Sequence, residues 1–340
     1  MQITTIGLDL AKHVFQVHGV DANEAVVEKR RLRRGQVLGY FAKLAPCRVG
    51  LEACATAHFW ARELRRLGHE VRLIPPQYVK AYLKRGKNDA ADAAAICEAA
   101  TRPSMRFVPI KSEEQQAVLI MHRARDLLVR QRTQLINALR GHLAEFGLVV
   151  AKGIGRVDEL LALAQADARL PQIAKATVTE LAQHLEGLDQ SIDAIDDDIA
   201  RAHRKNPKSC LIDQVPGIGT LIASVVAASA PDPGVFKSGR DFAAWLGLTP
   251  RQHSSGGKEK LGAITKQGNR YIRKMLVVGA TSVLRVVGKR KGALADWINA
   301  LRARKPERLA AVALANKLAR ICWAIMTTGE SFRTETYVKA

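Results

Sequence analysis

The sequence is short of aromatic residues and of acidic residues, and both shortages narrow what the protein can bind. Aromatic side chains make up 5% of the 340 residues, which argues against a module that stacks single-stranded bases. Asp and Glu number 32 against 53 Lys and Arg, so the formal net charge is +21 and the pI is near 10.1. That imbalance favours a polyanionic partner, DNA or RNA before a membrane.

Cysteine is also scarce, and the five cysteines show neither a CxxC motif nor a paired spacing. They suit reduced core thiols in a cytosol rather than disulfides or zinc ligands. We identify no signal peptide before the first strand-like segment and no apolar run of about 18 residues, so we expect no membrane span. A chain of 340 residues, 47% of them hydrophobic, is long enough for about two domains with substantial cores.

Residues 1–110 alternate between strand-like and helix-like patterns in the order β-β-β-α-β-α-β-α. Strands are expected at 3–10, 14–20, 25–32, 48–51 and 71–74. Short turns join the first three strands, which predicts an antiparallel meander, and Pro75-Pro76 stops the last strand. The order as a whole predicts a mixed sheet with helices.

Four carboxylates fall at notable places in this order. Asp89 and Asp92 lie one turn apart at the start of an Ala-rich helix and therefore share one helix face. A divalent cation would relieve their repulsion, although a solvated helix start is the alternative. Asp9 ends the first strand and Glu52 ends the fourth, so both emerge at one sheet edge if these strands are neighbours. Each alone reads as a surface carboxylate, but together the four predict a cation site with oxygen ligands.

This element order, with the four carboxylates in place, resembles the RNase H-like fold in its RuvC-like, Holliday-resolvase form. The sequences of residues 52–58, 75–80 and 87–93 are similar to those of the DEDD transposases of the insertion-sequence "one-ten" family, in its "eleven-eleven" subgroup. These transposases are relatives of the Piv-type DNA invertases. Many family members carry a Thr-Gly pair soon after the glutamate. Residues 54–57 read Cys-Ala-Thr-Ala here, so no role for that glycine carries over.

The resemblance implies an RNA-guided, site-specific DNA recombinase or transposase. Such a protein uses a non-coding bridge or seeker RNA to pair with donor and target double-stranded DNA. The resemblance also implies Mg²⁺ (or Mn²⁺) held by the four carboxylates, dimers and tetramers assembled on DNA, and a cytoplasmic, bacterial protein.

Residues 111–204 are expected to form a coiled-coil or oligomerisation segment. An Arg-rich helix is predicted from Glu113 to Phe146. In a second helix the apolar residues alternate spacings of three and four, which predicts a heptad seam: Val178, Leu181, Leu185, Leu188, Ile192, Ile195 and Ile199. Thr177 and Glu180 predict a capping box at its start. An intramolecular hairpin is the alternative to an oligomeric coil, and the acidic outer face of the second helix favours pairing with the Arg-rich helix or a partner subunit over phosphate.

Residues 205–340 read as a mainly α C-terminal transposase domain. The turn with Gly217 and Gly219 looks like the hairpin of a helix-hairpin-helix, whose free N–H groups receive phosphate without reading sequence; an ordinary tight turn is the alternative. A helix over 262–287 is predicted to carry basic residues at its start, either for phosphate or as a solvated face. The candidate nucleic-acid-binding residues are Gly217, Gly219, Lys258, Lys266, Arg270, Arg273, Lys274, Lys289, Arg290 and Lys291.

The Ser-Ser-Gly-Gly stretch at 254–257 reads as a linker by composition alone, since a serine hydroxyl is a weak nucleophile without activation. The family resemblance assigns it a different role. Residues 247–250 (Gly-Leu-Thr-Pro) match the family stretch that precedes a serine before glycine, and that serine attacks the DNA phosphate. The match places this role on Ser255, with Ser254 as the alternative.

Three hypotheses follow. The first is a recombinase in which the carboxylates hold the metal and Ser255 forms a covalent link to DNA. The second is a metal-dependent, structure-selective junction nuclease that cuts with water and forms no protein–DNA adduct. The third is a non-catalytic nucleic-acid-binding protein, which explains the charge but not the four carboxylates.

Overall fold

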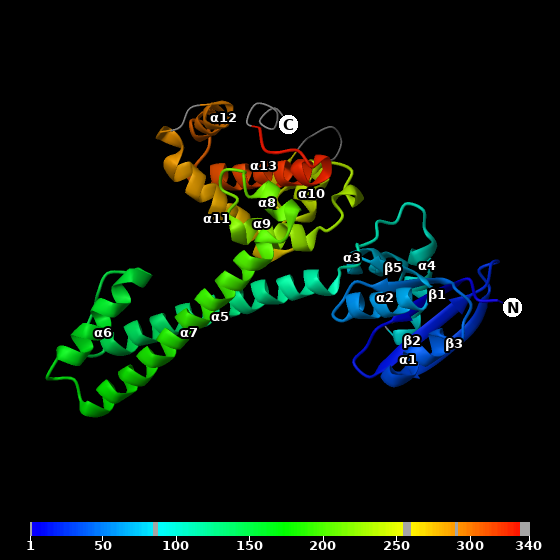
Figure 1. The fold of residues 1–340 in the computed structure, drawn as a ribbon, viewed down its shortest axis with the longest axis horizontal. Coiled ribbons are helices and arrows are strands. Elements are labelled where there is room, and N and C mark those ends of the chain that lie inside the picture. Colours follow the sequence, from blue (N-terminus) through cyan, green and yellow to red (C-terminus); the bar gives the residue numbers. More distant parts are fainter. Residues whose placement is uncertain (1, 84–87, 254–259, 290–291, 334–340) are drawn as a thin grey trace. The chain divides into compact units, whose positions relative to one another are not determined.

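The computed structural model describes residues 2–83, 88–253, 260–289 and 292–333, and the chain divides into two compact units. Unit 1 comprises residues 1–114 with 230–235, and unit 2 comprises 115–229 with 236–340. In Figure 1 the labelled strands all belong to the first part of the chain, where helices accompany them, and the elements labelled after α4 are all helices.

Unit 1 is built on a five-stranded mixed sheet. Its strands are β1 (Thr5–Asp9), β2 (Val14–Val20), β3 (Val26–Arg33), β4 (Arg48–Glu52) and β5 (Glu70–Ile74). They lie in the order β3-β2-β1-β4-β5, with β1–β2 and β2–β3 antiparallel and β1–β4 and β4–β5 parallel. The predicted mixed sheet is confirmed, and its strand order is consistent with the expected RNase H-like fold.

Helices cover both faces of this sheet because alternate strand residues point to opposite sides. Ile6 and Leu8 of β1 face a core shared with α1 (Val37–Phe41) and α2 (Ala57–Arg66). Gly7 faces the other way, against α4 (Asp89–Thr101), which packs on β1, β2 and β4. The short helix α3 (Pro76–Val79) follows β5. The sheet is therefore the middle layer of three.

Unit 2 is helical apart from a small hairpin. Two long helices, α5 (Glu113–Ala144, whose first residues belong to unit 1) and α7 (Gln172–Arg204), flank α6 (Val157–Ala166). The remaining elements are α8 (Pro207–Ile212), α9 (Thr220–Ser229), α10 (Gly239–Trp245), β6 (Pro250–Gln252), β7 (Leu261–Ile264), α11 (Arg270–Val286), α12 (Ala293–Arg302) and α13 (Glu307–Thr328).

The acidic face of α7 pairs with the Arg-rich helix α5. Arg125 forms two hydrogen bonds with the Asp196 carboxylate, and Arg132 donates to Asp189 at 2.6 Å. Most of the predicted heptad seam of α7 is buried within the chain, from Val178 through Ile199. The chain thus forms a helical hairpin with itself, and assembly of this segment with a second copy stays a prediction.

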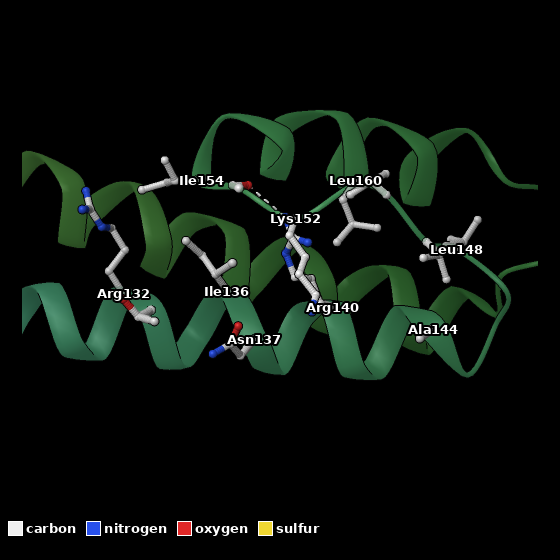
Figure 2. A pocket seen from close by; sticks show the side chains of 13 residues that line it. Arg132, Ile136, Asn137, Arg140, Ala144, Leu148, Lys152, Ile154 and Leu160 are labelled. Carbon is white, nitrogen blue, oxygen red and sulfur yellow. Dashed lines mark hydrogen bonds between the residues drawn. The ribbon is translucent and has the colours of Figure 1, made fainter. Parts of the chain in front are cut away.

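A hollow of about 520 Å³ lies where α5 and α6 meet the loop between them (Figure 2). Arg140 crosses it and donates to the carbonyls of Ala151 and Gly153. The 13 residues that line it include cations but no carboxylate, so it is not the predicted metal site.

Two local predictions in this unit are wrong. Helix α7 begins at Gln172 after Pro171, so Thr177 lies inside the helix and donates its hydroxyl to the Ile173 carbonyl instead of capping. The helix predicted over 262–287 begins only at Arg270, because Leu261–Ile264 pairs with β6 and the Asn269 side chain caps the first turn.

Helix α13 is long and apolar enough to cross a membrane by length and hydropathy alone, whereas we expected no such segment from the sequence. However, 61% of that stretch is buried inside unit 2, against α10 and α11 among others. Burial of this kind is typical of a core helix.

Candidate metal centre

The N-terminus of α4 presents two of the predicted carboxylates. The Asn88 side chain accepts a hydrogen bond from the Ala91 N–H at 2.8 Å, which fixes the start of the helix. Asp89 and Asp92 follow in the first turn, where the positive end of the helix dipole favours negative charge. The helix start therefore orients both carboxylates toward the same side, as the sequence predicted.

Asp9, at the carboxyl end of β1, joins these two residues. One carboxylate oxygen from each of Asp9, Asp89 and Asp92 lies within 4.8 Å of the others. Burial, followed by the charges of Asp92, Asp89 and Glu52, raises the pKa of Asp9 to about 6. A bound cation would relieve the part of this shift that comes from like charges, and carboxylate oxygens are ligands that suit Mg²⁺ or Mn²⁺.

Glu52 lies beside this trio rather than within it. Strand β4 runs parallel to β1 with Leu51 opposite Leu8. Glu52 and Asp9 therefore lie at the carboxyl ends of two neighbouring strands. The charges of Glu52 and Asp9 both raise the pKa of the Cys54 thiol, after the larger effect of burial. The structure therefore brings three predicted ligands together and places the fourth in the same negative field.

Two glycines that the sequence analysis did not single out set the distance between α4 and the sheet. A Cβ on Gly7 would lie 2.8 Å from the Cys97 Cβ and closer still to the Ala93 carbonyl oxygen. A Cβ on Gly50 would lie 2.7 Å from the Ala100 Cβ. The available signal was an isolated glycine inside a strand, which often marks a close approach of another backbone.

Comparison with known proteins connects this geometry to a family. A transposase model of the IS110 type with the DEDD motif matches residues 6–147, and a "Transposase IS116/IS110/IS902 family" model matches 209–295. The chain belongs to the IS110 family of transposases. It is 50% identical to a Pseudomonas aeruginosa protein named "Probable family 20 transposase", over 98% of this chain and 99% of that one.

Two further relatives are similar along nearly their whole length. The transposase for insertion sequence element IS1328 of Yersinia enterocolitica is 40% identical over 97% of this chain and 98% of its own. The transposase for insertion sequence element IS1111A of Coxiella burnetii is 40% identical over 97% and 92% respectively. Transposases cut and rejoin DNA, so this transposase is an enzyme that acts on DNA, and its DEDD family membership fits a divalent metal at the acidic cluster.

Strands β6 and β7 stand before and after the predicted serine in the sequence of this transposase. The residues just outside these two strands are packed closely against each other. Gly247 and Gly268 both have φ of +71°, and a Cβ on either would overlap backbone on the other side of the hairpin. Arg273 donates to the carbonyls of Leu246 and Gln267 at 2.9 and 2.7 Å. Ser254 and Ser255 themselves lie outside the described residues.

The predicted nucleic-acid-binding residues of the transposase have varied surroundings. Gly217 (φ +86°) packs so closely on Gly279 of α11 that a side chain would not fit, which gives it a packing role, whereas Gly219 faces open space. Lys274 pairs with Asp126 at 2.8 Å. Arg270 opens α11, and Lys266 precedes it with a left-handed backbone. The predicted residues Lys258, Arg290 and Lys291, and the side chain of Lys289, lie outside what the structure describes.

Proposed function

We propose that this transposase cuts and rejoins DNA with a site in two parts, the carboxylates of unit 1 and Ser255 of the C-terminal segment. The observation that supports this proposal most is the trio Asp9, Asp89 and Asp92. Their carboxylate oxygens lie within 4.8 Å of one another at the carboxyl end of β1, in the middle of an RNase H-like sheet. Carboxylates gathered at strand ends are typical of catalytic sites in sheets of this kind.

Each residue has a distinct role in this proposal. Asp9, Glu52, Asp89 and Asp92 hold Mg²⁺ or Mn²⁺, which when bound neutralises charge on the phosphate oxygens. The Ser255 hydroxyl loses its proton, and its oxygen forms a bond to phosphorus. At the same time the bond between phosphorus and the 3′ oxygen breaks, and the 3′ oxygen takes up a proton. Attack by a 3′-hydroxyl of the exchanged strand then restores the serine. Each step replaces one phosphate ester by another, so no ATP is consumed.

We also propose that a bridge or seeker RNA selects donor and target DNA, and that the protein acts as a dimer or tetramer on DNA. The family resemblance supports both statements, and the net charge of +21 suits a polyanionic partner such as RNA. Sequencing of nucleic acid that copurifies with the protein tests the first of them.

The test of the chemistry compares Ser255→Ala, Ser254→Ala and Asp9→Asn with the wild type, using the RNA and both DNAs. A denaturing gel reports any protein–DNA adduct. We expect an adduct with the wild type and with Ser254→Ala, and none with Ser255→Ala or Asp9→Asn. Strand exchange at the normal rate by Ser255→Ala refutes the serine assignment, and cleavage without any adduct favours the junction-nuclease alternative.

A further inference from the structure

Strand β3 carries an unusual density of positive charge. Four of its last five residues, from Lys29 to Arg33, are cationic. The strand lies at one edge of the sheet, with β2 as its neighbour. Because side chains alternate along a strand, the cations divide between the two faces of the sheet.

The register identifies which cations share the face of the carboxylates. Asp9 pairs with Gln16, and Gln16 pairs with Arg31, so these three residues form one row on the face covered by α4. Gly7, His18 and Lys29 form the next row. Two strand spacings separate Arg31 from Asp9, about 10 Å. Lys29, Arg31 and Arg33 therefore form a line of cations, hereafter the cation row, beside the carboxylate site.

The two faces of β3 differ in how their charges are engaged. On the opposite face Arg30 lies 3.0 Å from the Glu28 carboxylate and stacks on the Tyr40 ring at 5.5 Å. Lys29, Arg31 and Arg33 are exposed, and within the described residues no carboxylate forms an ion pair with them. The nearby positive charge of Lys29 contributes, after burial, to a lowered pKa of His18. The cation row is thus a concentration of positive charge without an ion pair in the part of the chain that the structure describes.

We propose that the cation row binds the phosphate backbone of the DNA strand that enters the carboxylate site. Alternate residues of a strand are about 6.6 Å apart, comparable with the separation of successive phosphates along a nucleic-acid strand. Arg31 lies in the same row of the sheet as Asp9, with the buried Gln16 between them, so a strand cut at Asp9 would pass close to the cation row. Contacts to phosphate position DNA without reading its sequence. This inference rests on the proposed function, since it takes the carboxylates as the place of cutting.

Charged residues on an edge strand also protect a sheet against pairing with another chain. That role requires charge on the strand but no particular face. The two explanations therefore predict different behaviour for neighbouring arginines of the same strand, which provides a matched control within β3.

The experiment measures the affinity of the full chain for a mixed-sequence DNA duplex over a range of salt concentrations. The variants are Arg31→Gln, its neighbour Arg30→Gln on the opposite face, and the triple Lys29→Gln/Arg31→Gln/Arg33→Gln. Each phosphate contact contributes about 0.9 to the slope of log K against log salt. We expect Arg31→Gln to reduce the slope by about 0.9, the triple variant by about 2.7, and Arg30→Gln to leave it unchanged.

Equal effects of Arg30→Gln and Arg31→Gln, or an unchanged slope with increased aggregation, would overturn the proposal in favour of edge protection. A loss confined to a structured RNA probe would overturn it in favour of an RNA-binding strand. The adduct assay separates the two proposals: if the wild type forms no adduct while Arg31→Gln still loses slope, the serine mechanism fails and the cation row stands.

Discussion

Substitution of Gly7 by alanine tests how the fold assembles the metal site. The added Cβ would lie 2.8 Å from the Cys97 Cβ, whereas ordinary contact begins at 3.4 Å, so α4 must move by at least 0.6 Å. The still closer Ala93 oxygen belongs to the α4 backbone and cannot rotate away. Asp89 and Asp92 move with the helix while Asp9 stays on β1. Metal sites tolerate ligand displacements of only about 0.2 Å, so the cation affinity should fall sharply.

The assay is thermal unfolding with and without MgCl₂, with far-UV circular dichroism as a check on folding. Overpacking should lower the stability of Gly7→Ala by about 1–3 kcal/mol. The rise in Tm that Mg²⁺ gives the wild type should be lost. Gly35→Ala is the matched control, because a Cβ there meets nothing within 4 Å, and its Mg²⁺ response should equal that of the wild type. A folded Gly7→Ala protein with an undiminished Mg²⁺ response refutes the reasoning.

If Gly7→Ala does not fold, Gly50→Ala replaces it. Its added Cβ would meet the side chain of Ala100 at 2.7 Å and the Ile96 carbonyl at 3.1 Å, a milder overlap with the same helix. We expect a weakened rather than abolished Mg²⁺ response, and an unchanged response counts equally against the reasoning.

Three further predictions concern charged or polar side chains. The pKa of Asp9 is raised to about 6, so its ionisation lowers the stability of the folded protein as pH rises from 3.8 to about 6. Asp9→Asn removes this cost and should increase the free energy of unfolding of the metal-free protein, measured in urea at pH 7, by about 1 kcal/mol after solvent screening is allowed for. Burial lowers the pKa of His122 to about 4, so the free energy of unfolding should decline by up to about 3 kcal/mol as pH falls from about 6.5 to 4. His122→Gln should flatten this pH dependence of stability. Arg273→Gln should lose the bonds to the Leu246 and Gln267 carbonyls and slow adduct formation, as measured on the denaturing gel.

Much of unit 1 was predictable because its signals are local. Alternating apolar residues, short turns and Pro75 define the strands, and the three-residue spacing of Asp89 and Asp92 places them on one helix face. The convergence of Asp9 with that helix depended on which strands are neighbours, and there the family resemblance contributed what spacing could not. The role of Gly7 was missed, since a close approach of two backbones leaves no periodic trace in sequence.

The errors in unit 2 have a common cause. Thr177 has the spacing of a capping residue, but the helix extends back to Pro171 because Leu170 and Val178 share one core cluster. Residues 262–264 read as the start of a helix, yet Leu261–Ile264 pairs with β6 and forms a strand. In unit 1 the strand predicted at 25–32 is present as β3, and only its register showed which of its cations share a face with Asp9. In the two errors of unit 2, tertiary contacts overrode local propensity.

Isothermal titration of Mn²⁺ into the whole chain shows whether separate carboxylates converge on one cation site. Asp92→Asn is measured beside the wild type, with Asp193→Asn, which removes an exposed carboxylate of α7, as the control. We predict saturable binding to the wild type and to Asp193→Asn, and its loss in Asp92→Asn. Equal binding by all three proteins would contradict it.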